Sequence, residues 1–227
     1  MPAKPSEQTR RKKAVLIVDD HPLARRGLAA LIDSEPDLIV CAEATTCRTA
    51  LRAVARCLPD LAIFDVALEG GDNGLDLVKA LKLSHPAIPA LVLSMHPEAV
   101  YAERALRAGA RGYLTKQEFG ETVLVAIRRV LAGHIYMSDA LAIDLATDFV
   151  GCDGKTRSPL ARLTDRELQV FRLIGEGRRT REIATILHLS LKTIESYREH
   201  LKQKLNIDCA PELIRRAVRF VETGEIG

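Results

Sequence analysis

The chain has 227 residues, which is long enough for two domains of ordinary size. Its 47% hydrophobic and 28% charged residues are typical of a soluble globular protein, and no apolar run reaches the roughly 18 residues that a bilayer helix needs. The net charge of +3 is too small to indicate a nucleic-acid binder, although the C-terminal part is mildly basic. The basic N-terminus has no apolar signal core after it, and the five cysteines lack paired spacing. We therefore expect a cytoplasmic protein with reduced thiols, no zinc site and no membrane partner.

In the first half of the chain, short runs rich in Val, Ile and Leu alternate with amphipathic stretches, as in a parallel sheet covered by helices. The runs predict five strands: Ala14–Val18, Leu38–Ala42, Leu61–Phe64, Ala90–Leu93 and Gly112–Leu114. The amphipathic stretches predict five helices: Pro22–Asp33, Thr46–Arg56, Leu75–Leu83, Pro97–Ala108 and Glu121–Ala132. These units predict a doubly wound, flavodoxin-like α/β domain over residues 14–133, after a disordered basic tail over residues 1–13.

A polar segment containing Gly and Pro divides this domain from the rest of the chain. One more helix is predicted at Ser138–Phe149, and residues 151–159 follow it as a linker. We assign residues 134–158 to the connection. Residues 159–227 predict an all-α domain of four short helices.

Each of these four helices has a start signal. Thr164 and Glu167 have the spacing of a capping box, so the first helix begins directly after Thr164. Thr180 and Ser190 can cap the second and third helices, and Pro211 suits the first turn of the fourth. The predicted inward side is Ile194, Tyr197, Leu201 and Leu205 in the third helix, and Leu213, Ile214, Ala217 and Val218 in the fourth.

Polar residues follow four of the predicted strands, at the edge where open α/β sheets bind their ligands. They are Asp19 and Asp20 after the first strand, Asp65 after the third, Ser94 after the fourth, and Thr115 with Lys116 after the fifth. Three carboxylates in one site repel one another, which a hard cation such as Mg²⁺ relieves. With the metal and a lysine ammonium neutralising phosphoryl oxygens, one carboxylate can act as a nucleophile and form an acyl phosphate. Any one of these residues has an ordinary explanation as a cap or surface charge, and only their coincidence indicates a site.

The set resembles the receiver domains of two-component systems, from about Ala14 to Ala132. The resemblance implies the phosphoacceptor Asp65, the phosphate contact Lys116, and the switch residues Ser94 and Tyr113. It implies a Mg²⁺ site of Asp20, Asp65 and the carbonyl of Ala67 as direct ligands, with Asp19 acting through water. The loop after Asp65 departs from the family pattern, because it lacks the usual proline and is one residue longer. This loop, Met95 and Ala67 leave the lifetime of the phosphorylated state open.

The second domain resembles the LuxR-type helix-turn-helix of the NarL/FixJ regulators, from Leu163 to Leu205, most specifically at residues 182–184 and 190–198. The resemblance places its third helix in the major groove of DNA. Six side chains suit phosphate contacts: Arg179, Arg181, Lys192, Thr193, Arg198 and Lys202. Glu195, Ser196 and Glu199 are candidates for base edges, although the two glutamates can equally be surface salt-bridge partners.

Together the two halves predict a response regulator and not an enzyme. A sensor histidine kinase is expected to phosphorylate Asp65, which controls homodimer formation and promoter binding, with RNA polymerase as a further partner. One alternative is an aspartyl phosphatase on a similar fold, but that class needs a second acid where Ala67 stands. The other is a phosphorylation-independent DNA binder with a degenerate receiver. The signal, the kinase, the operator and the direction of regulation stay open.

Overall fold

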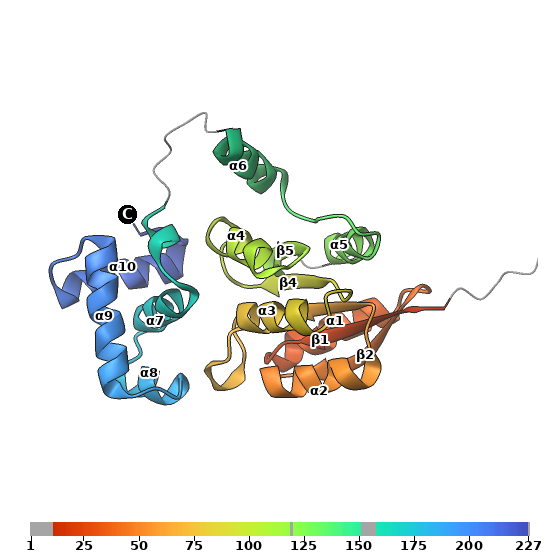
Figure 1. Cartoon of the computed structure of the whole chain (residues 1–227), viewed down its shortest axis with the longest axis horizontal. Coiled ribbons are helices and arrows are strands. Elements are labelled where there is room, and N and C mark those ends of the chain that lie inside the picture. Colours follow the sequence, from red (N-terminus) through yellow and green to blue (C-terminus); the bar gives the residue numbers. More distant parts are fainter. Residues whose placement is uncertain (1–10, 119, 151–157, 227) are drawn as a thin grey trace, which may run out of the picture.

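The computed structural model describes residues 11–118, 120–150 and 158–226, and in it an α/β part and an all-helical part lie side by side (Figure 1). The α/β part contains five strands: β1 (Lys13–Val18), β2 (Leu38–Ala44), β3 (Leu61–Phe64), β4 (Ala90–Ser94) and β5 (Gly112–Thr115). They form one parallel sheet in the order β2-β1-β3-β4-β5. This confirms the predicted doubly wound sheet.

The predicted N-terminal tail needs one correction. Lys13, assigned to the tail, is the first residue of β1 and pairs with Leu38 of β2. Its backbone N–H donates to the carbonyl of Asp37 at 2.8 Å, so the strand gains a hydrogen bond by starting one residue early. Residues 1–10 of the predicted tail lie outside the described residues.

Helices cover both faces of the sheet. They are α1 (Pro22–Asp33), α2 (Cys47–Cys57), α3 (Gly74–Ser84), α4 (Glu98–Ala108) and α5 (Glu121–Leu131), with short 3-10 turns at Glu69–Gly71 and Lys116–Glu118. Successive residues of a strand face opposite sides, so in β1 Val15 and Ile17 pack with α1 and α5, and Leu16 and Val18 pack with α2, α3 and α4. Burial on both faces explains why these strands are continuous apolar runs in the sequence.

The chain order of the sheet determines where a ligand site can form. From β1 the chain passes outward to β2 and then returns to β3 on the other side of β1. Strand ends diverge at such a reversal and leave a crevice at their carboxyl edge. Asp19 and Asp65 directly follow β1 and β3, so they lie at this crevice.

The rest of the described chain is helical. It contains α6 (Asp139–Val150), a 3-10 turn (Pro159–Arg162), α7 (Asp165–Gly175), α8 (Thr180–Ile186), α9 (Leu191–Leu205) and α10 (Ala210–Thr223). Helix α6 begins one residue later than predicted because Ser138 caps it, accepting a hydrogen bond from the backbone of Leu141 at 3.1 Å. Residues 151–157 of the predicted linker lie outside the described residues. The predicted four-helix arrangement is confirmed by α7 to α10.

Two of the three predicted side-chain caps are correct. Thr164 and Glu167 form a reciprocal capping box on α7, and Ser190 accepts a hydrogen bond from the backbone of Thr193 at the start of α9. The prediction for Thr180 was wrong, because it is the first helical residue of α8. At this helix start the Glu182 carboxylate accepts a hydrogen bond from the backbone N–H of Arg179 at 2.7 Å.

The inward faces of α9 and α10 follow the predicted periodicity with one exception. In α9, Ile194, Leu201 and Leu205 are buried and Tyr197 is half-buried. In α10 the buried residues are Leu213, Ala217 and Phe220. Ile214, expected inside, is 43% exposed because it lies about 100° around the helix from Leu213. Phe220 takes the inward position and packs on Phe171 of α7, with ring centroids 5.6 Å apart.

None of the helices in the described part of the chain combines the length and the apolar character needed to cross a bilayer.

Candidate functional site

A buried ion cluster occupies the crevice at the carboxyl edge of the sheet. Lys116, at the end of β5, is 6% exposed, and its Nζ lies 2.6 Å from both Asp19 Oδ2 and Asp65 Oδ2. Burial acts to lower the pKa of Lys116, but the carboxylates of Asp65 and Asp19 outweigh burial, so its pKa is raised. The lysine is therefore charged, and its ammonium offsets the repulsion between two carboxylates held at neighbouring strand ends.

Asp20 is the least satisfied member of this cluster. Its Oδ1 is buried and has no hydrogen-bond partner among the described residues, although His21 Nδ1 lies 2.8 Å away without hydrogen-bond alignment. Burial raises the pKa of Asp20, His21 acts against this, and the charges of Asp65 and Asp19 add to the rise. An acidic oxygen left in this state has a position open for a cation.

The donor set fits Mg²⁺. One ligand atom each from Asp19, Asp20, His21 and Asp65 lies within 4.8 Å of all the others, and three of the four are carboxylate oxygens. The carbonyl of Ala67 accepts none of the hydrogen bonds found in the described part of the chain, so it is also available. The structure thus brings together the acidic residues predicted for the metal.

Sequence reasoning missed His21 at this site. Its side chain is 63% exposed, at the mouth of the cluster, and its backbone N–H donates to Asp19 Oδ1 at 2.8 Å. Its position directly after the acidic pair and before Pro22 could have indicated it, because a residue between a strand end and a helix start faces the ligand edge.

The two predicted switch residues are buried beside the cluster. Ser94 is fully buried, and its Oγ accepts a long hydrogen bond from the backbone of His96 at 3.4 Å. Tyr113 is 1% exposed, and its hydroxyl donates to the carbonyl of His96 at 2.7 Å. The side chain of Tyr113 thus points inward in this structure. Both side chains connect the ligand edge to the loop that leads into α4.

His96 strengthens this connection. Its ring stacks on Tyr101 of α4 with centroids 4.8 Å apart. Burial, together with the nearby charges of Arg172 and Lys116, lowers the pKa of His96 to about 3, so the imidazole is neutral. Ser94 and Tyr113 thus both contact His96, whose ring packs on α4.

The unusual loop between β3 and α3, residues 65–74, is well fixed at its base. Ala67 pairs with Asn73 across an antiparallel bridge, and Asp72 Oδ2 accepts the backbone N–H of Cys47 at 2.8 Å, at the start of α2. Gly74 begins α3, where a Cβ would lie 1.8 Å from the carbonyl oxygen of Asp65. At the tip of the loop, Gly70 and Gly71 have φ of +73° and +76°, which glycine adopts readily.

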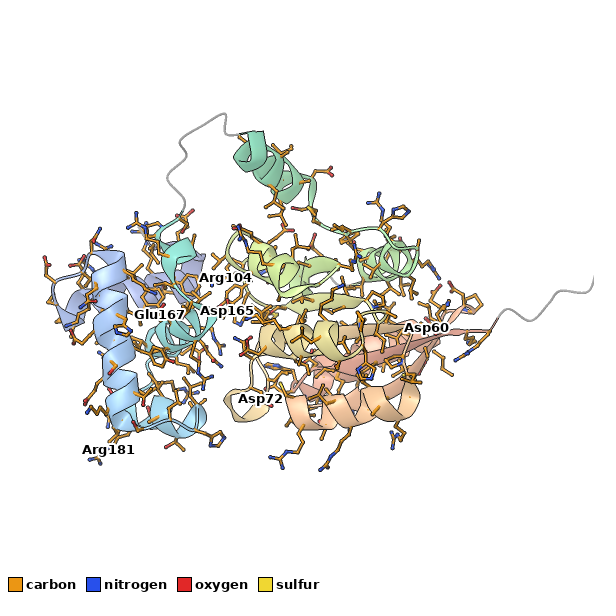
Figure 2. The ribbon with its side chains drawn as sticks, viewed as in Figure 1. Asp60, Asp72, Arg104, Asp165, Glu167 and Arg181 are labelled. Atoms are coloured by element: carbon orange, nitrogen blue, oxygen red, sulfur yellow. The ribbon has the colours of Figure 1, made fainter. Side chains whose placement is uncertain are left out.

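The second candidate site is the polar face of α9 and the start of α8. Exposed members are Arg179, Arg181, Lys192, Glu195, Ser196 and Glu199, and half-buried members are Thr193, Arg198 and Lys202. Arg181 points away from the protein at the far edge of the helical part (Figure 2). The structure thus places the predicted DNA contacts on α9 and at the start of α8.

Internal contacts divide the residues predicted to read bases. Glu199 forms an ion pair with Lys202 at 2.9 Å, so for this glutamate the structure has the surface salt bridge that the sequence left open. The hydroxyl of Ser196 donates to the carbonyl of Lys192 at 3.0 Å. Glu195 has no ion pair or side-chain hydrogen bond within the described ranges, so its carboxylate is the one left free to accept from a base.

Comparison with known proteins assigns a family to each part of the chain. Residues 15–128 match the family model described as response regulator receiver domain, and residues 161–217 match bacterial regulatory proteins of the luxR family. The transcriptional activator protein ExaE of Pseudomonas putida is 38% identical over 90% of this chain and 95% of its own length. The oxygen regulatory protein NreC of Staphylococcus carnosus is 32% identical over 90% of this chain and 96% of its own.

The chain belongs to the response regulators of the LuxR family. It is a two-component regulator whose phosphorylation controls transcription, as the sequence predicted. Among solved structures, RcsB from Salmonella enterica serovar Typhimurium, bound to promoter rprA in the presence of the phosphomimetic BeF₃⁻, superposes with a TM-score of 0.65. It is 24% identical and covers 90% of this response regulator and 98% of its own chain. The similarity confirms the predicted pair of folds.

Proposed function

We propose that Asp65 is the phosphoacceptor of this response regulator and that a sensor histidine kinase is the donor. The observation that carries this is the 2.6 Å contact between Lys116 Nζ and Asp65 Oδ2, in a pocket with two more carboxylates. An oxygen of Asp65 forms the bond to phosphorus, while the bond from phosphorus to the kinase imidazole nitrogen breaks and that nitrogen keeps the electron pair. Lys116 then neutralises phosphoryl oxygens.

A magnesium ion would complete the charge balance of this pocket. We propose that Asp19, Asp20, Asp65 and the carbonyl of Ala67 hold it, and that Ser94 and Tyr113 respond to the new phosphate. When bound, Mg²⁺ supplies the positive charge that draws an anionic phosphoryl group into an acidic site. The unpartnered Oδ1 of Asp20 supports this role.

We propose that α9 enters the major groove of promoter DNA, with Glu195 as the base-reading carboxylate. Phosphate contacts are assigned to Arg179, Arg181, Lys192, Thr193, Arg198 and Lys202. Thr193 and Lys202 are already engaged, in the cap of α9 and with Glu199. The promoter-bound RcsB supports promoter DNA as the ligand. A structure of two RcsB dimers bound to two parallel DNAs supports the proposed homodimer on phosphorylation. RNA polymerase is proposed as a further partner. We place the protein in the cytoplasm, where kinase and DNA are both within reach.

Residues 14–133 and 159–227 are proposed as the two functional domains, joined by residues 134–158. The alternatives are less well supported. A phosphatase of this kind needs an acidic residue two positions after its nucleophile, and that position is occupied by Ala67. We therefore propose that Asp65 accepts a phosphate without catalytic turnover. A degenerate receiver would not be expected to keep Lys116 buried between two carboxylates.

Phosphotransfer tests the assignment of Asp65. The full-length protein is incubated with Mg²⁺ and a radiolabelled small acyl phosphate, and protein-bound label is measured. We expect Asp65→Asn to take up no label and Asp76→Asn, an exposed carboxylate on α3, to match the wild type. Labelling of Asp65→Asn at the wild-type level would overturn the proposal.

A further inference from the structure

The loop after Asp65 contacts the helix-turn-helix domain directly. At its tip the carbonyl of Gly71 accepts hydrogen bonds from Gln169 Nε2 at 3.0 Å and from Arg166 at 3.4 Å, both on α7. Arg166 also donates to the carbonyl of Leu187 at 2.8 Å, just after α8. One receiver carbonyl is therefore held at the corner between α7 and α8, and Figure 1 shows this loop reaching toward α8.

The fit at this point depends on a missing side chain. A Cβ on Gly71 would lie 2.1 Å from the carbonyl oxygen of Ile186 in α8, a clash with backbone that no rotamer relieves. A Cβ on Gly70 would have its nearest neighbour, His188 Nε2, at 3.9 Å. Both glycines have a positive φ, so an alanine would be strained at either position. The two positions differ in how close an added Cβ would come to the other domain.

The same loop is connected to the acceptor pocket through a short stretch of backbone. Asp65 Oδ1 accepts the backbone N–H of Ala67 at 3.4 Å, and Ala67 is bridged to Asn73 on the returning side of the loop. A phosphoryl group on this carboxylate changes the acceptor of the Ala67 N–H. Because packed interfaces change between discrete arrangements, a small shift at Ala67 can release the carbonyl of Gly71.

This contact leaves the reading helix free. No hydrogen bond or ion pair within the described residues joins α9 to the receiver. The proposed DNA-contacting residues Arg181, Lys192 and Glu195 are exposed, so the loop does not cover them. The contact fixes the orientation of the helix-turn-helix domain relative to the receiver. Two copies of the protein must change this orientation to occupy DNA half-sites about one helical turn apart.

We propose that the tip of the β3–α3 loop is the receiver's docking surface for the α7–α8 corner, and that phosphorylation of Asp65 is passed to the DNA-binding domain through it. The route is separate from Ser94 and Tyr113, which lead to α4. It rests on the proposed role of Asp65.

The test compares Gly71→Ala with Gly70→Ala in the full-length protein. Both variants carry the cost of an alanine at positive φ, but only Gly71→Ala clashes with α8. Small-angle scattering gives the radius of gyration, and hydrogen exchange reports protection in α7 and α8, each before and after addition of a small acyl phosphate. We expect unphosphorylated Gly71→Ala to have the expanded size that the wild type reaches only with the donor, and at least about tenfold faster exchange in α8. Gly70→Ala should match the wild type.

A second variant guards against a folding defect of the loop. Gln169→Ala removes the donor from the other domain without altering the loop, and it should open the interface in the same direction to a smaller extent. The proposal is overturned if Gly71→Ala stays as compact as the wild type, or if Gly70→Ala expands equally. If Gly71→Ala opens but the wild type acquires no phosphate on Asp65, docking stands and the signalling role and the acceptor assignment are both refuted.

Discussion

Lys116 is the side chain on which the acceptor pocket depends most. It is the one cation buried between Asp19 and Asp65 in the described part of the chain, and both contacts are 2.6 Å. Removing it leaves buried carboxylates without compensation, which typically costs about 3–5 kcal/mol. We expect Lys116→Met to lower the unfolding temperature of the receiver clearly in metal-free buffer.

Magnesium provides the control for this variant. If the loss comes from carboxylate repulsion, Mg²⁺ should restore part of the unfolding temperature of Lys116→Met, and adding Asp65→Asn should recover part of it without metal. Differential scanning calorimetry with and without Mg²⁺ measures both effects. A Lys116→Met protein as stable as the wild type would contradict this account of the pocket.

Helix α7 owes its start to one buried carboxylate. Glu167 accepts the backbone N–H of Thr164 at 2.8 Å and the ammonium of Lys204 at 2.6 Å. Burial acts to raise the pKa of Glu167, but the hydrogen bonds from Lys204 and Thr164 outweigh it, so the pKa lies below its ordinary value of 4.5. A carboxyl with a lowered folded-state pKa stabilises the fold above that ordinary value and loses this contribution as the pH falls through the folded-state pKa.

We therefore expect Glu167→Gln to cost about 1–3 kcal/mol at neutral pH, because a charge-assisted contact is lost. The difference from the wild type should stay constant above pH 4.5 and shrink below it. Hydrogen exchange of α7 and α9 in mild denaturant at several pH values measures this. A difference that grew as the pH fell would show that the charge of Glu167 is not its source.

Helix α9 carries two exposed glutamates that the sequence could not rank. Glu199 is paired with Lys202, whereas Glu195 is unpaired in the described residues. We expect Glu195→Ala to relax the preference for one base pair, which is worth about 1–3 kcal/mol. Glu199→Ala should leave that preference intact and tighten binding to all sequences slightly, since it frees Lys202 for a phosphate.

Binding to duplexes selected from random DNA, measured at several salt concentrations, separates the two outcomes. Lys192→Ala serves as the reference for a phosphate contact and should reduce the salt slope by about one. Equal losses of base preference in Glu195→Ala and Glu199→Ala would reject the assignment made from the ion pair.

The two domains are held together by a second contact besides the loop tip. Arg104 of α4 is 14% exposed, pairs with Asp165 at 2.9 Å and donates to the carbonyls of Leu160 and Leu163. Lys79 of α3 also pairs with Asp165, but it is 45% exposed. Figure 2 shows Arg104 and Asp165 together between the receiver and α7.

Burial decides which of these two cations matters more. Arg104→Met should weaken domain docking by about 2–4 kcal/mol, because it leaves two carbonyl groups and a half-buried carboxylate without their hydrogen-bond donor. Lys79→Met should change it by at most about 1 kcal/mol, as for other partly exposed ion pairs. Small-angle scattering of the unphosphorylated protein should show expansion for Arg104→Met only. Equal effects of the two variants would contradict this ranking.

Local pattern was enough to predict both folds and most of the acceptor site. Strand apolarity and helix periodicity are patterns between residues close in the sequence, and they predict the elements. Because adjacent parallel strands end at one edge of a sheet, the sequence also predicts that Asp19, Asp65 and Lys116 lie together. His21, the ion pair that occupies Glu199 and the contact at Gly71 could not be predicted in this way. Each depends on atoms far apart in the chain or on side-chain rotamers, and their positions follow from packing between elements, which no periodicity encodes.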